Sequence, residues 1–154
     1  MKKGKYIVLE IIPSSVDPKN GDVIQLSALK IDDLKLIDRF DYRLDKDKVN
    51  NIDLLNMTNY DNDNFIYLSS TRRIMMRFKK WIENYDLLII DNIYTKNYLK
   101  NIKNNKESIF NYLNMQMSDD VIEKMMDKYN LEPSNHIVDL LYEALISESN
   151  NIHR

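Results

Sequence analysis

Two apolar runs near the N-terminus constrain the fold of this chain more than any other feature. The first run, Tyr6–Ile12, carries a single carboxylate, Glu10, where a strand would be expected to have an apolar residue. The second run, Val23–Lys30, follows a polar stretch containing Asn20-Gly21, a dipeptide typical of turns between antiparallel strands. We therefore predict an antiparallel pair of strands at residues 5–12 and 22–31.

Further strands are predicted from two other patterns. Residues 34–44 alternate partly between apolar and polar side chains, which indicates a third strand in a meander with the first two. The continuous apolar run Leu87–Ile90 is too short for a core helix and is typical of a strand buried on both faces. A short strand is also predicted near residues 108–113. The sequence thus predicts a five-stranded sheet.

The clearest predicted helix spans residues 69–83. Its apolar residues recur at helical spacing on one face, and Ser69 or Ser70 would cap its first turn. The remaining positions hold five basic residues, Arg72, Arg73, Arg77, Lys79 and Lys80. They form either a solvated face or a patch that meets phosphate groups. Three more helices are predicted, at residues 92–103, 119–129 and 135–147.

The size and composition of the chain set limits on its class. With 154 residues, of which 44% are hydrophobic, it fits one soluble domain with a single core. No run approaches the roughly 18 apolar residues of a membrane span, and we expect no secretory signal. The absence of cysteine agrees with a cytoplasmic location. With a net charge of −2, any surface for nucleic acid would have to be local.

The first strand and the residues after it, Glu10-Ile11-Ile12-Pro13-Ser14-Ser15, resemble an opening motif in their layout. The motif is Asp-x-Glu-Thr-Thr-Gly of the DEDD-type 3′-5′ exonucleases, which include the proofreading subunit of bacterial replicative polymerase. The order of predicted elements over residues 5–147 is similar to theirs as well. The resemblance implies an α/β, RNase H-like fold with a mixed five-stranded sheet, helices on both faces, and one exonuclease-like domain over residues 1–154.

The resemblance also implies a chemistry, which this sequence keeps only in part. In the family, four carboxylates bind two divalent metals about 4 Å apart and a histidine acts as general base. The family's first aspartate falls on Glu10 and its histidine on His136, but Ile12, Lys96 and Leu141 stand where other carboxylates would be. We therefore expect no intact catalytic set and no bound metal. Ile12 and Leu141 would extend the core, and Lys96 would form an ion pair with Glu10.

Six residues are candidate binding residues because of where they fall in the family's motifs. They are Ser14, Ser15, Thr58, Asn92, Tyr94 and Lys96. The two serines fall where the family contacts the terminal nucleotide, and Thr58 falls in a segment that shapes its substrate cleft. Residues 91–96 follow the buried strand and align with a His-Asn-x-x-Phe-Asp motif, in which Asn92 agrees. For Thr58, a plain loop with a helical turn remains the alternative.

Three functions remain open from the sequence. The first is a catalytically inactive, exonuclease-like protein that binds single-stranded nucleic acid or a protein partner. The second is a divergent exonuclease that uses Mg²⁺ or Mn²⁺ at a reduced site formed by Glu10, Asp91, Asp139 and His136. The third is a structural or assembly protein whose tyrosines form an interface, including one between copies of the chain.

Overall fold

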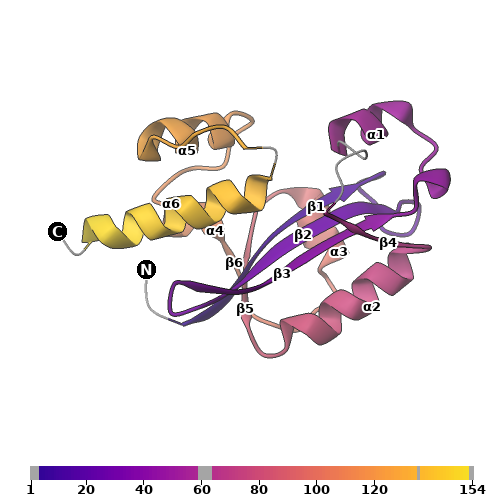
Figure 1. Ribbon diagram of the computed structural model, residues 1–154, viewed down its shortest axis with the longest axis horizontal. Helices are drawn as coiled ribbons and strands as arrows, with labels where there is room; N and C mark the ends of the chain where they lie inside the picture. Colours follow the sequence, from indigo (N-terminus) through magenta and orange to yellow (C-terminus); the bar gives the residue numbers. More distant parts are fainter. Residues whose placement is uncertain (1–3, 59–63, 135, 153–154) are drawn as a thin grey trace.

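The computed structural model describes residues 4–58, 64–134 and 136–152. They form one mixed sheet with helices on both of its faces (Figure 1). The elements in chain order are β1 (Lys5–Pro13), β2 (Val23–Asp32), β3 (Lys35–Leu44), a 3₁₀ turn (Lys46–Lys48), α1 (Ile52–Thr58), β4 (Ile66–Leu68), α2 (Thr71–Ile82), β5 (Asp86–Ile89), α3 (Ile93–Tyr98), β6 (Lys106–Ser108), α4 (Ile109–Tyr112), α5 (Val121–Tyr129) and α6 (Ile137–Ile152).

The strand order of the sheet is β4-β3-β2-β1-β5-β6. Strands β1, β2 and β3 pair antiparallel, whereas β5 pairs parallel to β1 and β6 parallel to β5. The predicted α/β class, the meander and the buried strand β5 are confirmed. The predicted number of five strands is wrong, because β4 adds a sixth strand parallel to the end of β3. With only three residues, β4 is too short to produce a periodic pattern in the sequence.

The connection between β1 and β2 differs from the tight turn that Asn20-Gly21 suggested. Residues 14–22 form a longer loop that is closed by the Ser14 N–H donating to the Asp22 carbonyl, at 2.8 Å. Gly21 is needed there for a close approach, since a Cβ atom on it would lie 2.5 Å from the hydroxyl oxygen of Tyr98. The glycine therefore indicates packing of the loop against α3 and not a two-residue hairpin.

Two predicted elements end earlier than expected. The strand predicted near residues 108–113 ends at Ser108, and the next four residues form α4. The reason is that Ile109, Phe110 and Leu113 all contact one core, and their spacing places them on the same side of a helical turn and not of a strand. The helix predicted to extend to residue 103 ends at Tyr98.

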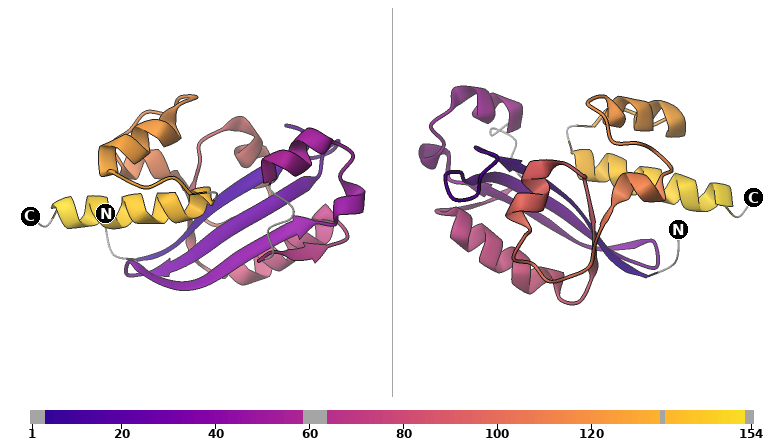
Figure 2. Two further views of the ribbon diagram at one scale, coloured as in Figure 1. Left: turned by 45° about the horizontal axis from the view of Figure 1, so that its top comes forward. Right: turned by 180° about the vertical axis from the view of Figure 1, so that it is seen from behind.

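Side chains of β1 and β2 alternate between two cores on opposite faces of the sheet. Ile7, Leu9 and Ile11 of β1 pack with α2 in the first core, whereas Tyr6 and Val8 pack with α4, α5 and α6 in the second. In Figure 1 helix α2 lies on one side of the sheet and α5 and α6 on the other, and the rear view in Figure 2 agrees. By this alternation Glu10 belongs to the α5–α6 face.

Helix α2 confirms the amphipathic pattern read from the sequence. Ile74, Phe78 and Ile82 are buried, and the Ser70 side chain accepts a hydrogen bond from the Arg73 N–H at the first turn. The cap is therefore Ser70, one of the two predicted residues. All five basic residues of the helix are exposed. In the part of the chain that the structure describes, no helix combines the length and apolarity needed to cross a membrane.

Candidate functional site

A cavity of about 320 Å³ lies where the family resemblance would put its catalytic site. We call it the Glu10 cavity. Its lining comes from β1, the residue after β5, the start of α3, the segment before α5, and the first residues of α5 and α6. The lining residues are Glu10, Ile11, Ile90, Asn92, Tyr94, Thr95, Met117, Ser118, Asp119, Val121, Ile122 and Ile137. The structure therefore brings together three predicted residues, Glu10, Asn92 and Tyr94.

Glu10 is the ionisable group that its surroundings perturb most in this cavity. Burial raises the pKa of Glu10 from 4.5 to about 7, because a carboxylate loses solvation among the apolar side chains. Within the described residues Glu10 has no hydrogen-bond or ion-pair partner. Burial and the nearby Glu10 charge also raise the pKa of the Tyr94 hydroxyl. The surroundings of Glu10 therefore favour its neutral, protonated form more than water does.

The predicted ion pair between Lys96 and Glu10 is wrong. The Lys96 ammonium lies 2.8 Å from a carboxylate oxygen of Asp91, and both side chains are partly exposed. Residue 96 is in the last turn of α3, and it lines a second cavity instead of the Glu10 cavity. An ion pair formed at the surface keeps both groups hydrated, which is less costly than burying the lysine beside Glu10.

The other two replaced positions differ from each other. Leu141 is fully buried in the second core, as predicted. Ile12 is partly exposed, so the prediction that it extends the core is wrong. It lies near the end of β1, where the register with β2 shifts between Ile12 and Pro13. The strand leaves the core at this point, which explains the exposure of its side chain.

His136 immediately precedes α6, and its ring packs against an aromatic side chain. The imidazole and the Phe65 ring are stacked, with centroids 5.6 Å apart and planes 16° apart. The guanidinium of Arg43 lies 3.7 Å from the centroid of the same phenyl ring. His136 Nδ1 is buried without a hydrogen-bond partner among the described residues. The imidazole is thus held by stacking, and it does not line the Glu10 cavity, although its neighbour Ile137 does.

Three of the candidate binding residues make hydrogen bonds within the protein. Ser14 Oγ accepts from the Asp22 N–H at 2.8 Å, and Ser15 Oγ accepts from the Asp17 N–H at 3.2 Å. Asn92 caps α3, where its side chain accepts from the Thr95 N–H at 3.0 Å. These hydrogen bonds within the protein account for the two serines and the asparagine without a ligand.

Thr58 is the last residue of helix α1. The rest of the proposed cleft turn, residues 59–61, lies outside the described residues, as does the environment of the Thr58 side chain.

A second cavity, of about 450 Å³, lies at the carboxyl ends of the parallel strands β5 and β6. We call it the lysine cavity. It is lined by Ile89, Asp91, Lys96, Lys100, Lys106, Glu107, Ser108 and Asn111. Lys106 Nζ donates to the carbonyls of Ile102 and Asn104, whereas Lys96 pairs with Asp91. Ligands of open α/β sheets are commonly bound at this end of the strands.

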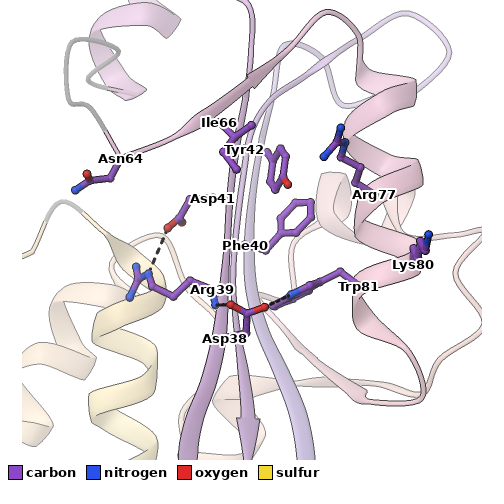
Figure 3. A pocket seen from close by; sticks show the side chains of 10 residues that line it. All are labelled: Asp38, Arg39, Phe40, Asp41, Tyr42, Asn64, Ile66, Arg77, Lys80 and Trp81. Carbon is purple, nitrogen blue, oxygen red and sulfur yellow. Dashed lines mark hydrogen bonds and ion pairs between the residues drawn. The ribbon is translucent and has the colours of Figure 1, made fainter.

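A third depression, a groove of about 900 Å³, was not predicted from the sequence. Asp38, Arg39, Phe40, Asp41 and Tyr42 of β3 line it with Asn64, Ile66, and Arg77, Lys80 and Trp81 of α2. We call it the β3–α2 groove. Figure 3 shows that Arg39 and Asp41 extend to one side of β3, and Phe40 and Tyr42 to the side of α2. The basic residues of α2 were noted in the sequence, but their partner strand could not be inferred from helical periodicity alone.

The carboxylates that the reduced metal site would need do not lie together. Asp91 pairs with Lys96, and Asp139 lies 2.8 Å from the Arg39 guanidinium. Asp119, which no sequence motif indicates, does line the Glu10 cavity. Among the described residues, no group of three or more aspartate, glutamate, histidine or cysteine side chains could hold a metal ion.

Neither the protein-family models nor the curated proteins include a match to this chain. The class that the fold defines is an α/β protein with a mixed six-stranded sheet, whose first three strands are antiparallel. Within that class, the features particular to this chain are the Glu10 cavity, the lysine cavity and the β3–α2 groove.

Proposed function

We propose that this chain is a catalytically inactive protein with an RNase H-like, exonuclease-derived fold, and that it acts by binding. The order of its elements supports the ancestry. Three antiparallel strands come first, followed by parallel strands that alternate with helices, as the resemblance to DEDD-type exonucleases implies. The fold alone does not define the activity, so the proposal depends on the residues around Glu10.

The observation that carries the proposal is that, among the described residues, no cluster of carboxylates able to hold a metal ion surrounds Glu10. A two-metal site needs several carboxylates around the metals, because hard divalent cations take oxygen ligands. Here Leu141 is in the core, and Asp91 forms an ion pair with Lys96. A cavity with a raised Glu10 pKa also disfavours the charged form that would bind a cation.

Single-stranded nucleic acid is the ligand that the two cavities fit best. The Glu10 cavity offers the Tyr94 ring and apolar side chains to a base, and a protonated Glu10 can donate a hydrogen bond to it. The lysine cavity borders the same segment of the chain, since residues 89, 91 and 96 line it. Lys96 and Lys100 would meet the phosphate groups of the adjoining nucleotides.

An exonuclease assay tests the inactivity. The purified protein is incubated with 3′-labelled single-stranded DNA and RNA in Mg²⁺ and in Mn²⁺, next to the Glu10→Ala variant, which controls for contaminating nuclease. We expect no trimming by either protein. Metal-dependent trimming that the substitution abolishes would establish the divergent exonuclease and overturn the proposal.

A binding assay without metal tests the ligand. Fluorescence anisotropy of a labelled oligothymidylate should report binding that weakens with added salt. Tyr94→Ala should weaken it by about 5- to 150-fold, the effect of roughly 1–3 kcal/mol for one lost stacking contact. Lys100→Glu should weaken it further, whereas the matched charge reversal Arg77→Glu in α2 should leave it unchanged. Equal effects of both reversals would place the binding outside the two cavities.

A further inference from the structure

The β3–α2 groove lies at an open edge of the sheet. Strand β4 pairs with β3 only at Tyr42–Leu44, and no other described residue pairs with β3 on that side between Lys35 and Asp41. The residues that line the groove, from Asp38 to Tyr42, cover the part of this edge nearest to β4. An open edge presents backbone groups that can pair with a further strand.

The backbone groups that face this edge belong to Arg39 and Asp41. At the end of the same strand, the Asp45 N–H donates to the Leu68 carbonyl of β4 at 2.9 Å. Backbone groups that point to one side of a strand recur every second residue, so those of Arg39 and Asp41 point the same way. The Arg39 N–H confirms the direction, because it donates outward to the Asp38 carboxylate at 2.9 Å.

The groove combines this edge with aromatic and basic side chains. Trp81 and Tyr42 are partly exposed, and the Phe40 ring lies between them, 5.3 Å and 4.1 Å from their centroids. Ile66, at the end of the groove, is 53% exposed. Helix α2 has five basic residues and no acidic residue between Thr71 and Ile82, and two of the five, Arg77 and Lys80, line the groove.

We propose that the β3–α2 groove binds an acidic segment of a partner protein, which lies extended along β3 as an added strand. Main-chain hydrogen bonds to Arg39 and Asp41 would align the segment, its acidic residues would meet Arg77 and Lys80, and its apolar residues would contact Trp81 and Ile66. This site lies on the edge of the sheet away from the two cavities of the proposed function, and it is independent of that function.

A second copy of the chain fits the edge poorly. Antiparallel pairing centred on Arg39 puts that residue opposite itself, and pairing centred on Asp38 brings two aspartates together. In a register that pairs Arg39 with Asp41 of the second copy, β3 of each copy would clash with β4 of the other. The reason is that β4 already pairs with β3 from Tyr42 onward. A nucleic acid could contact Arg77 and Lys80, but it has no peptide backbone with which to pair with β3.

The Asp38 side chain limits access of an added strand to the edge of β3. Its carboxylate accepts from the Arg39 N–H and from Trp81 Nε1, at 2.9 Å each, as Figure 3 shows. It therefore competes for the backbone donor that an added strand would use, and it repels acidic residues. Two substitutions separate these effects. Asp38→Asn removes the charge and keeps an acceptor for the N–H, whereas Asp38→Ala removes both.

The test is a selection from a random-peptide display library on the wild-type protein, counter-screened on an Arg77→Glu, Lys80→Glu variant. Both side chains are exposed, so the variant should fold, and circular dichroism checks this. Selected peptides should be acidic with alternating apolar residues, and should bind the variant at least about tenfold more weakly. Raising the salt concentration from about 0.1 M to about 1 M should also weaken the binding of these peptides.

Selected peptides should shift the amide resonances of Arg39 and Asp41, and should bind Asp38→Ala more tightly than Asp38→Asn. Equal affinities for these two variants would overturn the added strand. If the selection yields no acidic peptides, the proposal of an acidic partner is wrong. It is also wrong if the Asp38→Ala variant alone, without any peptide, sediments as a dimer. If oligothymidylate alone binds, and the double variant abolishes that binding, the groove is a nucleic-acid surface and the proposal is wrong.

Discussion

Glu10 is a carboxyl group whose protonation favours the folded state. Its pKa is about 7 in the folded protein and 4.5 in an ordinary environment. Between these values the folded protein binds more protons at Glu10 than the unfolded chain does, so its contribution to the free energy of unfolding falls as pH rises from 4.5 to about 7. The loss is at most about 3 kcal/mol, and less because part of the side chain is exposed.

Glu10→Gln should remove this loss. We expect the variant to be about 1–3 kcal/mol more stable than the wild type at about pH 8, and equally stable at about pH 4, where the folded wild type is protonated. Urea unfolding at a series of pH values measures the difference. The exposed Glu132→Gln is the matched control. A stability difference that is the same at every pH would show that solvation of Glu10 is not the cause.

Leu141 stands where the resemblance to exonucleases would place a catalytic aspartate, and its substitution tests how far this position belongs to the core. The side chain is fully buried, so Leu141→Asp should cost about 3–5 kcal/mol at neutral pH through an unpaired buried carboxyl group. The cost should shrink in acid as the aspartate is protonated, whereas that of Leu141→Ala should not. Thermal unfolding of the three proteins measures this. A Leu141→Asp variant that keeps wild-type stability and is stabilised by Mn²⁺ would indicate a metal site that needs one ligand restored.

Among the helices and strands, the N-terminal cap of α2 allows a prediction for which a neighbouring serine is the control. Ser70 Oγ accepts from the Arg73 N–H at 3.2 Å, whereas the neighbouring Ser69 is exposed and precedes the cap. Ser70→Ala should lower the free energy of unfolding by about 1 kcal/mol, and Ser69→Ala by less than about 0.5 kcal/mol. Chemical denaturation distinguishes them. Equal effects would mean that the hydrogen bond does not stabilise the helix.

The elements that the sequence predicted are those with several helical turns or a distinct apolar run. Helix α2 shows the helical period because only one of its faces is buried, whereas β1, β2 and β5 are apolar runs because both of their faces are buried. Strand β4 and helix α4, with three and four residues, are too short for a period, and their conformation depends on the cores that Leu68 and Phe110 enter. The sequence also predicted a turn at Gly21 but not the reason for the glycine. The reason is the nearby Tyr98 hydroxyl, which belongs to a helix distant in the chain.

The candidate site was predictable where it depended on strand positions and not where it depended on side-chain partners. Glu10, Asn92 and Tyr94 meet at one cavity because β1 and β5 are adjacent. Lys96 was expected to neutralise Glu10, but the partner it reaches is Asp91, five residues earlier in the chain. The β3–α2 groove joins a strand and a helix that no local sequence pattern connects, so the sequence alone does not show that their charged and aromatic side chains lie together.

At the scale of the whole molecule, β1 and β2 link the two cores. Each strand contributes side chains to both faces of the sheet, so loss of packing on one face exposes the strands that the other face needs. We therefore predict that the chain unfolds as one cooperative unit, as a single domain would. Trp81, the one tryptophan, lies on the α2 face and reports that side of the sheet by its fluorescence.

Leu145→Ala in α6 tests this cooperativity from the opposite face. Leu145 is buried in the second core, and truncating it should cost about 2–5 kcal/mol. If the cores unfold together, the denaturation midpoint seen by Trp81 fluorescence should fall by the same amount as the midpoint seen by circular dichroism. If the α5–α6 layer unfolds separately, only the circular dichroism midpoint should fall. That second outcome would also mean that the Glu10 cavity, which this layer closes, opens at a free energy below that of global unfolding.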